Sequence, residues 1–234
     1  MGDGVDDGAQ ETLLEICVET VAGALAAERG GADRLELCAR LDVGGLTPSS
    51  ALVAATRTQT SLPLVVLVRP RAGDFRSTAS ELRQMRAQID TARDAGAQGV
   101  ALGVLRGDGA VDVDALAALV ERARSGRLEV CFHRAFDGVV DRGAALEALV
   151  ALGVDRVLTS GGPPRAADGL VALRALVEQA AGRITIMPGG GVRAADALRI
   201  ARETGCREIH SSAGMPPDGD AMRVRELREA LDAD

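Results

Sequence analysis

Gly31-Ala32-Asp33-Arg34 is the stretch that decides the fold, because related four-residue motifs return at Gly96, Gly153 and Gly205. In each copy the glycine suits the left-handed residue that ends a helix, and a strand-like segment follows. The copies are about 50 to 65 residues apart, which is about two strand–helix units of a barrel of this size. We therefore predict an α/β fold, a single-domain (β/α)8 barrel of the TIM type over residues 13–234.

Short apolar runs alternate with stretches of helical period along the rest of the chain. Continuous apolar runs are typical of strands that are covered on both faces. An open doubly wound sheet is the alternative, but it leaves the repeated motif unexplained and does not favour eight units. The predicted strands are residues 13–19, 34–38, 64–69, 99–105, 128–133, 156–160, 183–187 and 208–211.

Two helix starts have clear local signals. Thr78 and Glu81 have the spacing of a capping box, in which each side chain accepts a hydrogen bond from the backbone N–H of the other. Thr47 before Pro48 predicts an N-cap followed by proline at the first helical position.

Lysine is absent from the 234-residue chain, in which all cationic residues other than the two histidines are arginines. Its absence excludes Schiff-base aldolase catalysis and covalent attachment of pyridoxal phosphate (PLP), because both need a lysine amine. The net charge is -7 and no basic stripe is present, so we expect no nucleic-acid partner.

The beginning of the chain is polar and acidic, and we predict a disordered tail over residues 1–12. It lacks the basic start and apolar run of a signal peptide, and no apolar run reaches the length of a membrane helix. We therefore expect a cytoplasmic protein with no membrane partner. The four cysteines are widely spaced and should be reduced thiols in that compartment.

Polar residues gather where the predicted strands end, which is the edge that carries the sites of such barrels. Buried carboxylates there need cations, and we expect Arg69, Arg71 and Arg134 to pair with Glu15 and Glu36. An acid–base site is one interpretation, and a structural network of buried ion pairs is the other. The rim has the residue types of an enzyme site, but the sequence assigns no reaction. The candidate catalytic residues are Glu15, Glu36, Arg69, Arg71, His133, Arg134, Asp137 and His210.

A glycine-rich loop after the seventh predicted strand is the best candidate anion site. Glycines let the backbone approach a ligand, and the free amides that begin a helix favour an anion. Arg193 adds a positive charge with bidentate reach. The alternative is a tight turn that only needs glycine. The proposed phosphate-binding cluster comprises Ser160, Gly161, Gly189, Gly190, Gly191, Arg193, Ser211 and Ser212.

Two cysteines, Cys17 and Cys38, belong to the first two predicted strands at similar depth. Paired thiolates suit a soft cation such as Cu(I). The alternative is a pair of small buried apolar residues, which is the usual role of an unpaired cysteine. Residue types alone leave both interpretations open.

The chain resembles the CutC family, which is named for copper homeostasis. The resemblance rests on LEIC (14–17), GADRLELC (31–38), GGLTPS (44–49), RPRAGDF (69–75), FHRAFD (132–137), VLTSG (157–161) and HSSAG (210–214). It implies a cytosolic TIM-type barrel, a homodimer and a link to copper tolerance. It also implies that the copper thiols of the family fall on Cys17 and Cys38.

Two hypotheses about function follow. The first is a protein of copper homeostasis whose partner is a copper ion, bound as Cu(I) by Cys17 and Cys38. The second is a barrel enzyme whose partner is a small phosphorylated or carboxylated metabolite, held by the glycine and serine loops at the rim.

Overall fold

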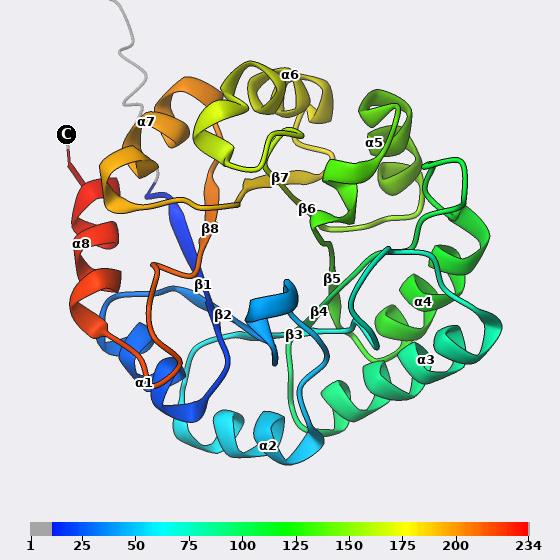
Figure 1. Cartoon of the computed structure of the whole chain (residues 1–234), viewed down its shortest axis with the longest axis horizontal. Coiled ribbons are helices and arrows are strands. Elements are labelled where there is room, and N and C mark those ends of the chain that lie inside the picture. Colours follow the sequence, from blue (N-terminus) through cyan, green and yellow to red (C-terminus); the bar gives the residue numbers. More distant parts are fainter. Residues whose placement is uncertain (1–10, 234) are drawn as a thin grey trace, which may run out of the picture.

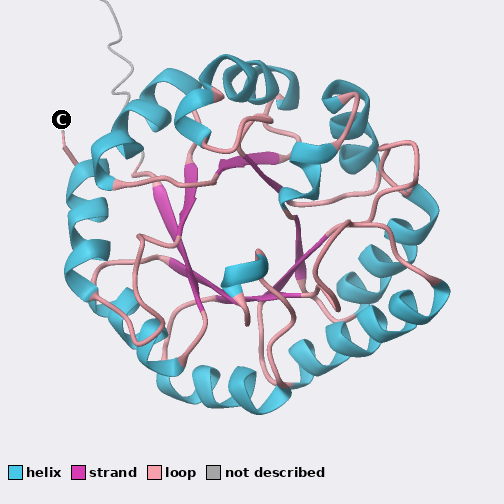
Figure 2. Ribbon diagram, viewed as in Figure 1, coloured by secondary structure: helices cyan, strands magenta, loops and turns pink. Residues whose placement is uncertain are grey.

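Parallel strands form a ring at the centre of the molecule, and helices surround it (Figures 1 and 2). A computed structural model describes residues 11–233. Within that range the strands are β1 (Leu13–Val18), β2 (Arg34–Leu37), β3 (Leu64–Leu67), β4 (Gly99–Leu102), β5 (Glu129–Phe132), β6 (Arg156–Thr159), β7 (Thr185–Pro188) and β8 (Glu208–Ser211).

The helices follow the strands in alternation and form the outer wall of the ring. The α-helices are α1 (Val21–Arg29), α2 (Ser50–Gln59), α3 (Ala79–Asp94), α4 (Val113–Ser125), α5 (Arg142–Ala151), α6 (Leu170–Ala180), α7 (Ala194–Thr204) and α8 (Ala221–Leu231). Three short 3-10 helices lie in the loops: η1 (Leu41–Val43), η2 (Arg134–Gly138) and η3 (Ala166–Asp168).

The strand order confirms the predicted single-domain (β/α)8 barrel for residues 11–233. Hydrogen-bonded neighbours run β7-β6-β5-β4-β3-β2-β1-β8. The two end strands, β7 and β8, lie side by side, although no ladder joins them in the described part of the chain. The barrel is therefore nearly closed. Of the predicted tail, residues 1–10 lie outside the described residues.

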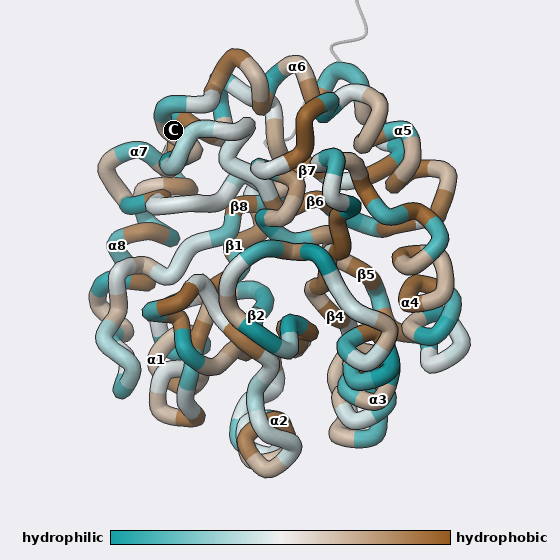
Figure 3. The backbone as a smooth tube through the Cα atoms, turned by 45° about the vertical axis from the view of Figure 1, so that its right-hand side comes forward, coloured by the Kyte–Doolittle hydropathy of each residue, from teal (hydrophilic) through white to brown (hydrophobic). Residues whose placement is uncertain are grey.

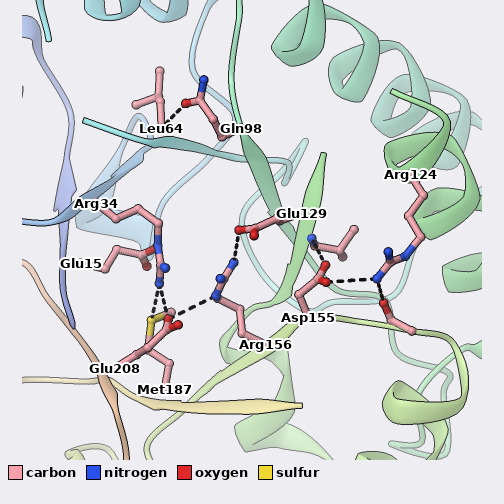
Figure 4. A network of polar contacts seen from close by, with 12 residues as sticks. Glu15, Arg34, Leu64, Gln98, Arg124, Glu129, Asp155, Arg156, Met187 and Glu208 are labelled. Atoms are coloured by element: carbon pink, nitrogen blue, oxygen red, sulfur yellow. Dashed lines mark hydrogen bonds and ion pairs between the residues drawn. The ribbon is translucent and has the colours of Figure 1, made fainter. Parts of the chain in front are cut away.

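The repeated motif has a structural role at the beginning of every second strand–helix unit, before β2, β4, β6 and β8. Its glycine has a positive φ in all four copies, between 71° and 91°, as the prediction of a left-handed helix end requires. Its third residue ties down the preceding strand in three copies: the side chains of Asp33, Gln98 and Asp155 accept hydrogen bonds from the backbone N–H groups of Leu14, Leu64 and Val130. Two of these contacts are drawn in Figure 4.

Side chains alternate between the two faces of each strand. On β1, Leu14, Ile16 and Val18 belong to the apolar layer between the ring and the helices. Cys17 belongs instead to a small cluster inside the barrel, together with Val65, Leu67, Cys131, Met187 and others. The interior of such a barrel is filled by side chains. Polar residues on the inward face of the strands are therefore buried unless they reach the mouth of the barrel.

Helix α3 illustrates how the outer helices are made. The predicted capping box is present, because Thr78 N–H donates to Glu81 and Glu81 N–H donates to Thr78 Oγ1. Met85, Ile89 and Ala92 form the buried stripe, and most of the other residues of the helix are hydrophilic (Figure 3). The predicted N-cap at Thr47 is wrong: Ser49 caps α2, since the Thr47 hydroxyl instead accepts from Arg69 N–H.

Several strands are shorter than predicted, because the chain turns away at the mouth after the last ladder residue. Cys38 and His133 lie just beyond β2 and β5, although their N–H groups still donate to Val18 and Leu102 of the neighbouring strands. The mouth residues are thus held by the ladders without belonging to them. No helix among residues 11–233 is long and apolar enough to cross a membrane.

Candidate functional site

A cavity of about 270 Å³ opens at the carboxyl end of the strands, where the sequence predicted a site. We call it the mouth pocket. The short helix η1 projects over the centre of the ring (Figure 1), and its Leu41 lines the cavity. The predicted residues that line the pocket are Cys17, Glu36, Arg69, His133, Arg134, Gly190, Gly191, His210, Ser211 and Ser212.

The two thiols predicted to lie at similar depth are in contact. Cys17 Sγ and Cys38 Sγ are 3.4 Å apart, and both side chains are buried. The hydrogen bond with Cys38, burial and the nearby Glu36 charge raise the pKa of the Cys17 thiol well above its usual value. In the metal-free protein Cys17 is therefore a thiol, and a metal ion must displace its proton. Two adjacent sulfur atoms fit a soft cation.

Glu36 is a buried carboxyl group in the pocket with one unsatisfied oxygen. It is 5% exposed, and its Oε2 atom has no hydrogen-bond partner among the described residues. Burial raises the pKa of Glu36 above its ordinary value, although the charge of His210 opposes this shift. A buried carboxylate without a partner is costly. The pocket therefore contains an oxygen atom that a cation, a proton or a ligand donor could satisfy.

His210 lies beside this carboxylate and is held from behind by Glu15. Its Nδ1 atom is 2.8 Å from Glu15 Oε1, in register with the β1–β8 pairing of the same two residues. Burial lowers the pKa of His210, but the hydrogen bond to Glu15 and the charges of Glu36 and Glu15 outweigh burial and raise it. The ring is fixed in orientation, and its other nitrogen, Nε2, is left for the pocket side.

The prediction that Arg69, Arg71 and Arg134 pair with Glu15 and Glu36 is wrong. Glu15 pairs with Arg34, whose Nε is 2.5 Å from Glu15 Oε2, and not with Arg69, Arg71 or Arg134. The reason is register: Arg34 on β2 lies directly opposite Glu15 on β1, whereas the predicted arginines lie beyond the strand ends. Burial raises the pKa of Glu15, but the charge of Arg34 and the His210 hydrogen bond outweigh it and hold the pKa well below its usual value.

Arg34 begins a chain of ion pairs across the amino-terminal end of the barrel (Figure 4). Arg34 Nη2 is 2.5 Å from Glu208, and Arg156 lies 3.2 Å from the same Glu208 oxygen and 2.8 Å from Glu129. We call Glu15, Arg34, Glu129, Arg156 and Glu208 the floor network. It matches the structural interpretation that the sequence left open, but only for Glu15 among the predicted site residues.

His133 has an apolar setting on the opposite side of the pocket. Its ring lies 5.0 Å from the Phe75 ring, and its Nδ1 accepts from Ala135 N–H. Burial, and secondly the charge of Arg69, lower the pKa of His133 to about 3. His133 is therefore neutral at physiological pH, with its proton on Nε2, an atom that has no hydrogen-bond partner in residues 11–233. It can donate a hydrogen bond to a ligand.

The arginines of the rim differ in whether a carboxylate already compensates their charge. Arg69 donates to the carbonyl groups of Val43, Gly45 and Gly73, and no carboxylate pairs with it in the described residues. Arg71 is 42% exposed and pairs with Asp74 and Glu81, away from the pocket. Arg69 therefore keeps an uncompensated charge at the pocket wall, and Arg71 does not.

Arg134 and Asp137 form a second fixed unit at the rim. Asp137 Oδ2 accepts from Arg134 Nε at 2.8 Å, and its Oδ1 accepts from Thr159 and from Ser160 N–H. Arg134 also donates to Ser160 Oγ and lines the pocket. Asp137 and Ser160 thus position Arg134 and do not themselves line the cavity.

The predicted anion cluster is only partly assembled. Gly190 and Gly191, which have φ values of 107° and 68°, line the pocket beside Ser211 and Ser212. Gly161 and Gly189 pack against other parts of the chain, where a Cβ would collide with Gly169 and Leu158. Arg193 donates to its neighbour's carbonyl, and the carboxylate of Asp196 already accepts from Arg193 N–H at the beginning of α7.

Sequence reasoning missed Arg34, Arg156 and Glu208, although the signal was present. All three are the fourth residue of the repeated motif, and each is the first residue of a strand. Inward-facing charges at that position occur in three of the four copies, with Gly99 as the exception. A charge comparison between copies would have predicted the floor network.

Comparisons with known proteins agree on one family. The model of the CutC family matches residues 12–215. A human protein named copper homeostasis protein cutC homolog is 43% identical over 230 residues, which are 98% of this chain and 83% of the human protein. A family protein CutC from Xanthomonas campestris is 48% identical over 203 residues, 87% of this chain and 84% of that protein. The crystal structure of a CutC protein from Streptococcus agalactiae superposes with a TM-score of 0.81 at 32% identity, covering 86% of this chain and 98% of that one.

Proposed function

Because this chain belongs to the CutC family, we propose that it binds Cu(I) through Cys17 and Cys38 and acts in copper homeostasis in the cytoplasm. The family match supports the link to copper homeostasis. Binding through the two cysteines and the cytoplasmic location are our own proposals.

The observation that carries the proposal is the contact between the two sulfur atoms. At 3.4 Å apart, Cys17 Sγ and Cys38 Sγ can reach one ion with small adjustments of their side chains. Thiolates select soft cations such as Cu(I) over the hard cations that prefer oxygen. The mouth pocket gives a path to the pair, because Cys17 lines it.

The other cysteines give a matched control. Cys131 is buried in the same interior cluster but does not line the pocket, and Cys206 belongs to the outer apolar layer. All four are free thiols. A variant without Cys131 and Cys206 therefore loses as many sulfur atoms as one without Cys17 and Cys38.

An anaerobic competition titration with a chromophoric Cu(I) chelator tests the proposal. We expect the wild type and the Cys131→Ser, Cys206→Ser variant to bind one equivalent tightly. The Cys17→Ser, Cys38→Ser variant should bind at least about 100-fold more weakly, because loss of outer-shell partners alone typically costs 10- to 100-fold. Equal affinities in the two double variants would rule out the proposed ligands.

A second function is favoured by the opposite wall of the same pocket. We propose that the barrel also acts on a small phosphorylated or carboxylated metabolite, with Arg69 and Arg134 facing its anionic group. The backbone at Gly190 and Gly191 and the hydroxyl groups of Ser211 and Ser212 supply further polar contacts. A cavity at the carboxyl end of a barrel, with polar groups that converge on it, is the usual form of a small-molecule site.

Crystals soaked with inorganic phosphate test this second function. We expect phosphate in the mouth pocket within hydrogen-bond distance of Arg69 or Arg134, and loss of that density in Arg69→Met. Phosphate bound only outside the mouth pocket would contradict the proposal.

A further inference from the structure

Cys17 has a second set of neighbours, separate from Cys38. Potential ligand atoms of Cys17, Glu36 and His210 all lie within 4.8 Å of one another. We propose that these three side chains bind a divalent cation of the zinc type at the base of the mouth pocket. This inference does not depend on Cu(I) binding, because the oxidation state and two of the three ligands differ.

The unpartnered Glu36 oxygen points to a cation and not only to a chance cluster. Glu36 is only 5% exposed, and its Oε2 atom receives no hydrogen bond from residues 11–233. Protein interiors rarely leave such an atom without a partner. Cys17 and His210, which lie beside it and line the same cavity, are residue types that coordinate zinc.

His210 already has the support that metal-bound histidines usually receive. Its Nδ1 atom is hydrogen-bonded to Glu15, which is itself paired with Arg34. A carboxylate behind the ring fixes the orientation of a ligating histidine and increases its basicity. Because Nδ1 is bonded to Glu15, Nε2 is the nitrogen that we assign as the ligand.

The spacing allows a metal with one open position. In a tetrahedral shell with bonds of about 2.0 to 2.3 Å, ligand atoms lie about 3.3 to 3.7 Å apart. Ligand atoms that lie within 4.8 Å of one another would have to move together by about 1 Å to reach this spacing. Three protein ligands leave the fourth position free, as in catalytic zinc sites. Here that position faces the mouth pocket, because all three side chains line it.

The donor set distinguishes this site from a Cu(I) site. One thiolate, one carboxylate and one imidazole form a mixed set whose two negative charges balance a divalent ion, whereas Cu(I) prefers sulfur. Arg69 and Arg134, which line the same cavity, would favour an anionic group at the open position. This last step rests on the second proposed function, and the metal site itself does not.

Titration of the reduced, metal-free protein with Co²⁺ under anaerobic conditions tests the site. We expect one Co²⁺ per chain, an absorption band from a single thiolate ligand, and competition by Zn²⁺. Glu36→Gln should weaken Co²⁺ binding by about 100-fold or more, since outer-shell changes alone cost 10- to 100-fold. Cys131→Ser, which removes a buried cysteine outside the group, should bind as the wild type does.

Two further variants separate this site from the Cu(I) proposal. Cys38→Ser should lose Cu(I) affinity and keep the Co²⁺ band, whereas Glu36→Gln should do the reverse. Failure of Cu(I) binding with intact Co²⁺ binding leaves the inference standing. Absence of a stoichiometric Co²⁺ complex in the wild type, or equal Co²⁺ affinity in folded Glu36→Gln, would overturn it; circular dichroism establishes that the variant is folded.

Discussion

Charged side chains are buried at both the floor and the mouth of the barrel, but the two regions differ in how completely these side chains find partners. In the floor network Arg34 bridges Glu15 and Glu208, and Arg156 bridges Glu208 and Glu129. In the mouth pocket Glu36 Oε2, His133 Nε2 and Arg69 Nε are buried without partners in residues 11–233. The two regions are joined by one residue, since Glu15 contacts both Arg34 and His210.

The difference distinguishes charged side chains that stabilise the fold from charged side chains that are available to bind a ligand. Buried ions that satisfy one another contribute to structure, and removing one partner leaves the others uncompensated. Buried polar atoms that protein groups leave unsatisfied cost free energy, and functional sites are where such a cost is tolerated. Substitutions at the floor should therefore lower stability, and substitutions at the mouth should alter binding.

The largest effect is expected at the floor. Arg34→Met leaves Glu15 and Glu208 without their shared cation, and we expect the free energy of unfolding to fall by about 3 to 5 kcal/mol. Urea denaturation at neutral pH measures it. Arg174→Met removes an exposed pair with Glu178 and should cost less than about 1 kcal/mol. If Arg34→Met lowered the free energy of unfolding by a similarly small amount, the proposed difference between floor and mouth would be contradicted.

The next effect comes from His133 and depends on pH. The unfolded chain binds a proton on this ring near pH 6.5, whereas burial lowers the pKa in the folded protein to about 3. Stability is therefore full above pH 6.5 and is lost as the pH falls toward 3. We expect a loss of about 2 kcal/mol between pH 6.5 and 4.5, measured by urea denaturation in the presence of EDTA.

Two measurements check the assignment to His133. His133→Asn should flatten the pH dependence in that window. The chain has only two histidines, so NMR can follow each ring, and the His133 resonances should not titrate above pH 4.5. A His133 midpoint near 6.5 would contradict the buried, neutral ring.

A smaller effect of opposite sign is expected at Glu36. Burial raises its pKa, so the ionised form at neutral pH carries a cost that the neutral amide of Glu36→Gln avoids. We expect the variant to be more stable than the wild type by about 1 kcal/mol, as is common for substitutions that relieve a functional site. A loss of stability comparable to that of Arg34→Met would show that the mouth is a second structural network.

The smallest effect is expected for Arg71, which the sequence placed among the catalytic candidates. Its charge is already compensated by Asp74 and Glu81 at a largely solvated position. Arg71→Ala should change the free energy of unfolding by about 0.5 kcal/mol or less and leave Cu(I) affinity unchanged. The same denaturation and chelator assays apply, and a tenfold change in Cu(I) affinity would place Arg71 in the site after all.

The fold could be predicted because the signals that specify it are local. A glycine at the end of every second helix and a short strand-like segment after it define a repeat of two units, and the four copies of the repeat correspond to eight units. The proximity of Cys17 and Cys38 was predicted from their similar depth on adjacent strands, although the register pairs Cys17 with Glu36 and places Cys38 two residues further along. Strand ends were less predictable, because the mouth residues bend away while their hydrogen bonds continue.

The partners of the site residues could not be predicted in the same way. Glu15 pairs with Arg34 because β1 and β2 have one particular register, which the hydrophobic pattern alone does not fix. Arg193 was predicted to face an anion, but Asp196 occupies the beginning of its helix. The direction of a side chain within a loop depends on tertiary contacts. The sequence therefore indicated the edge of the barrel that carries the site, but not which site residues pair with one another.

X-ray absorption at the copper edge, on protein loaded with one equivalent of Cu(I) under anaerobic conditions, tests the central claim most directly. The proposal predicts a shell of two sulfur neighbours in the wild type, unchanged in the Cys131→Ser, Cys206→Ser variant and absent from the Cys17→Ser, Cys38→Ser variant. A shell of nitrogen or oxygen atoms, or a sulfur shell that survives the loss of Cys17 and Cys38, would contradict it.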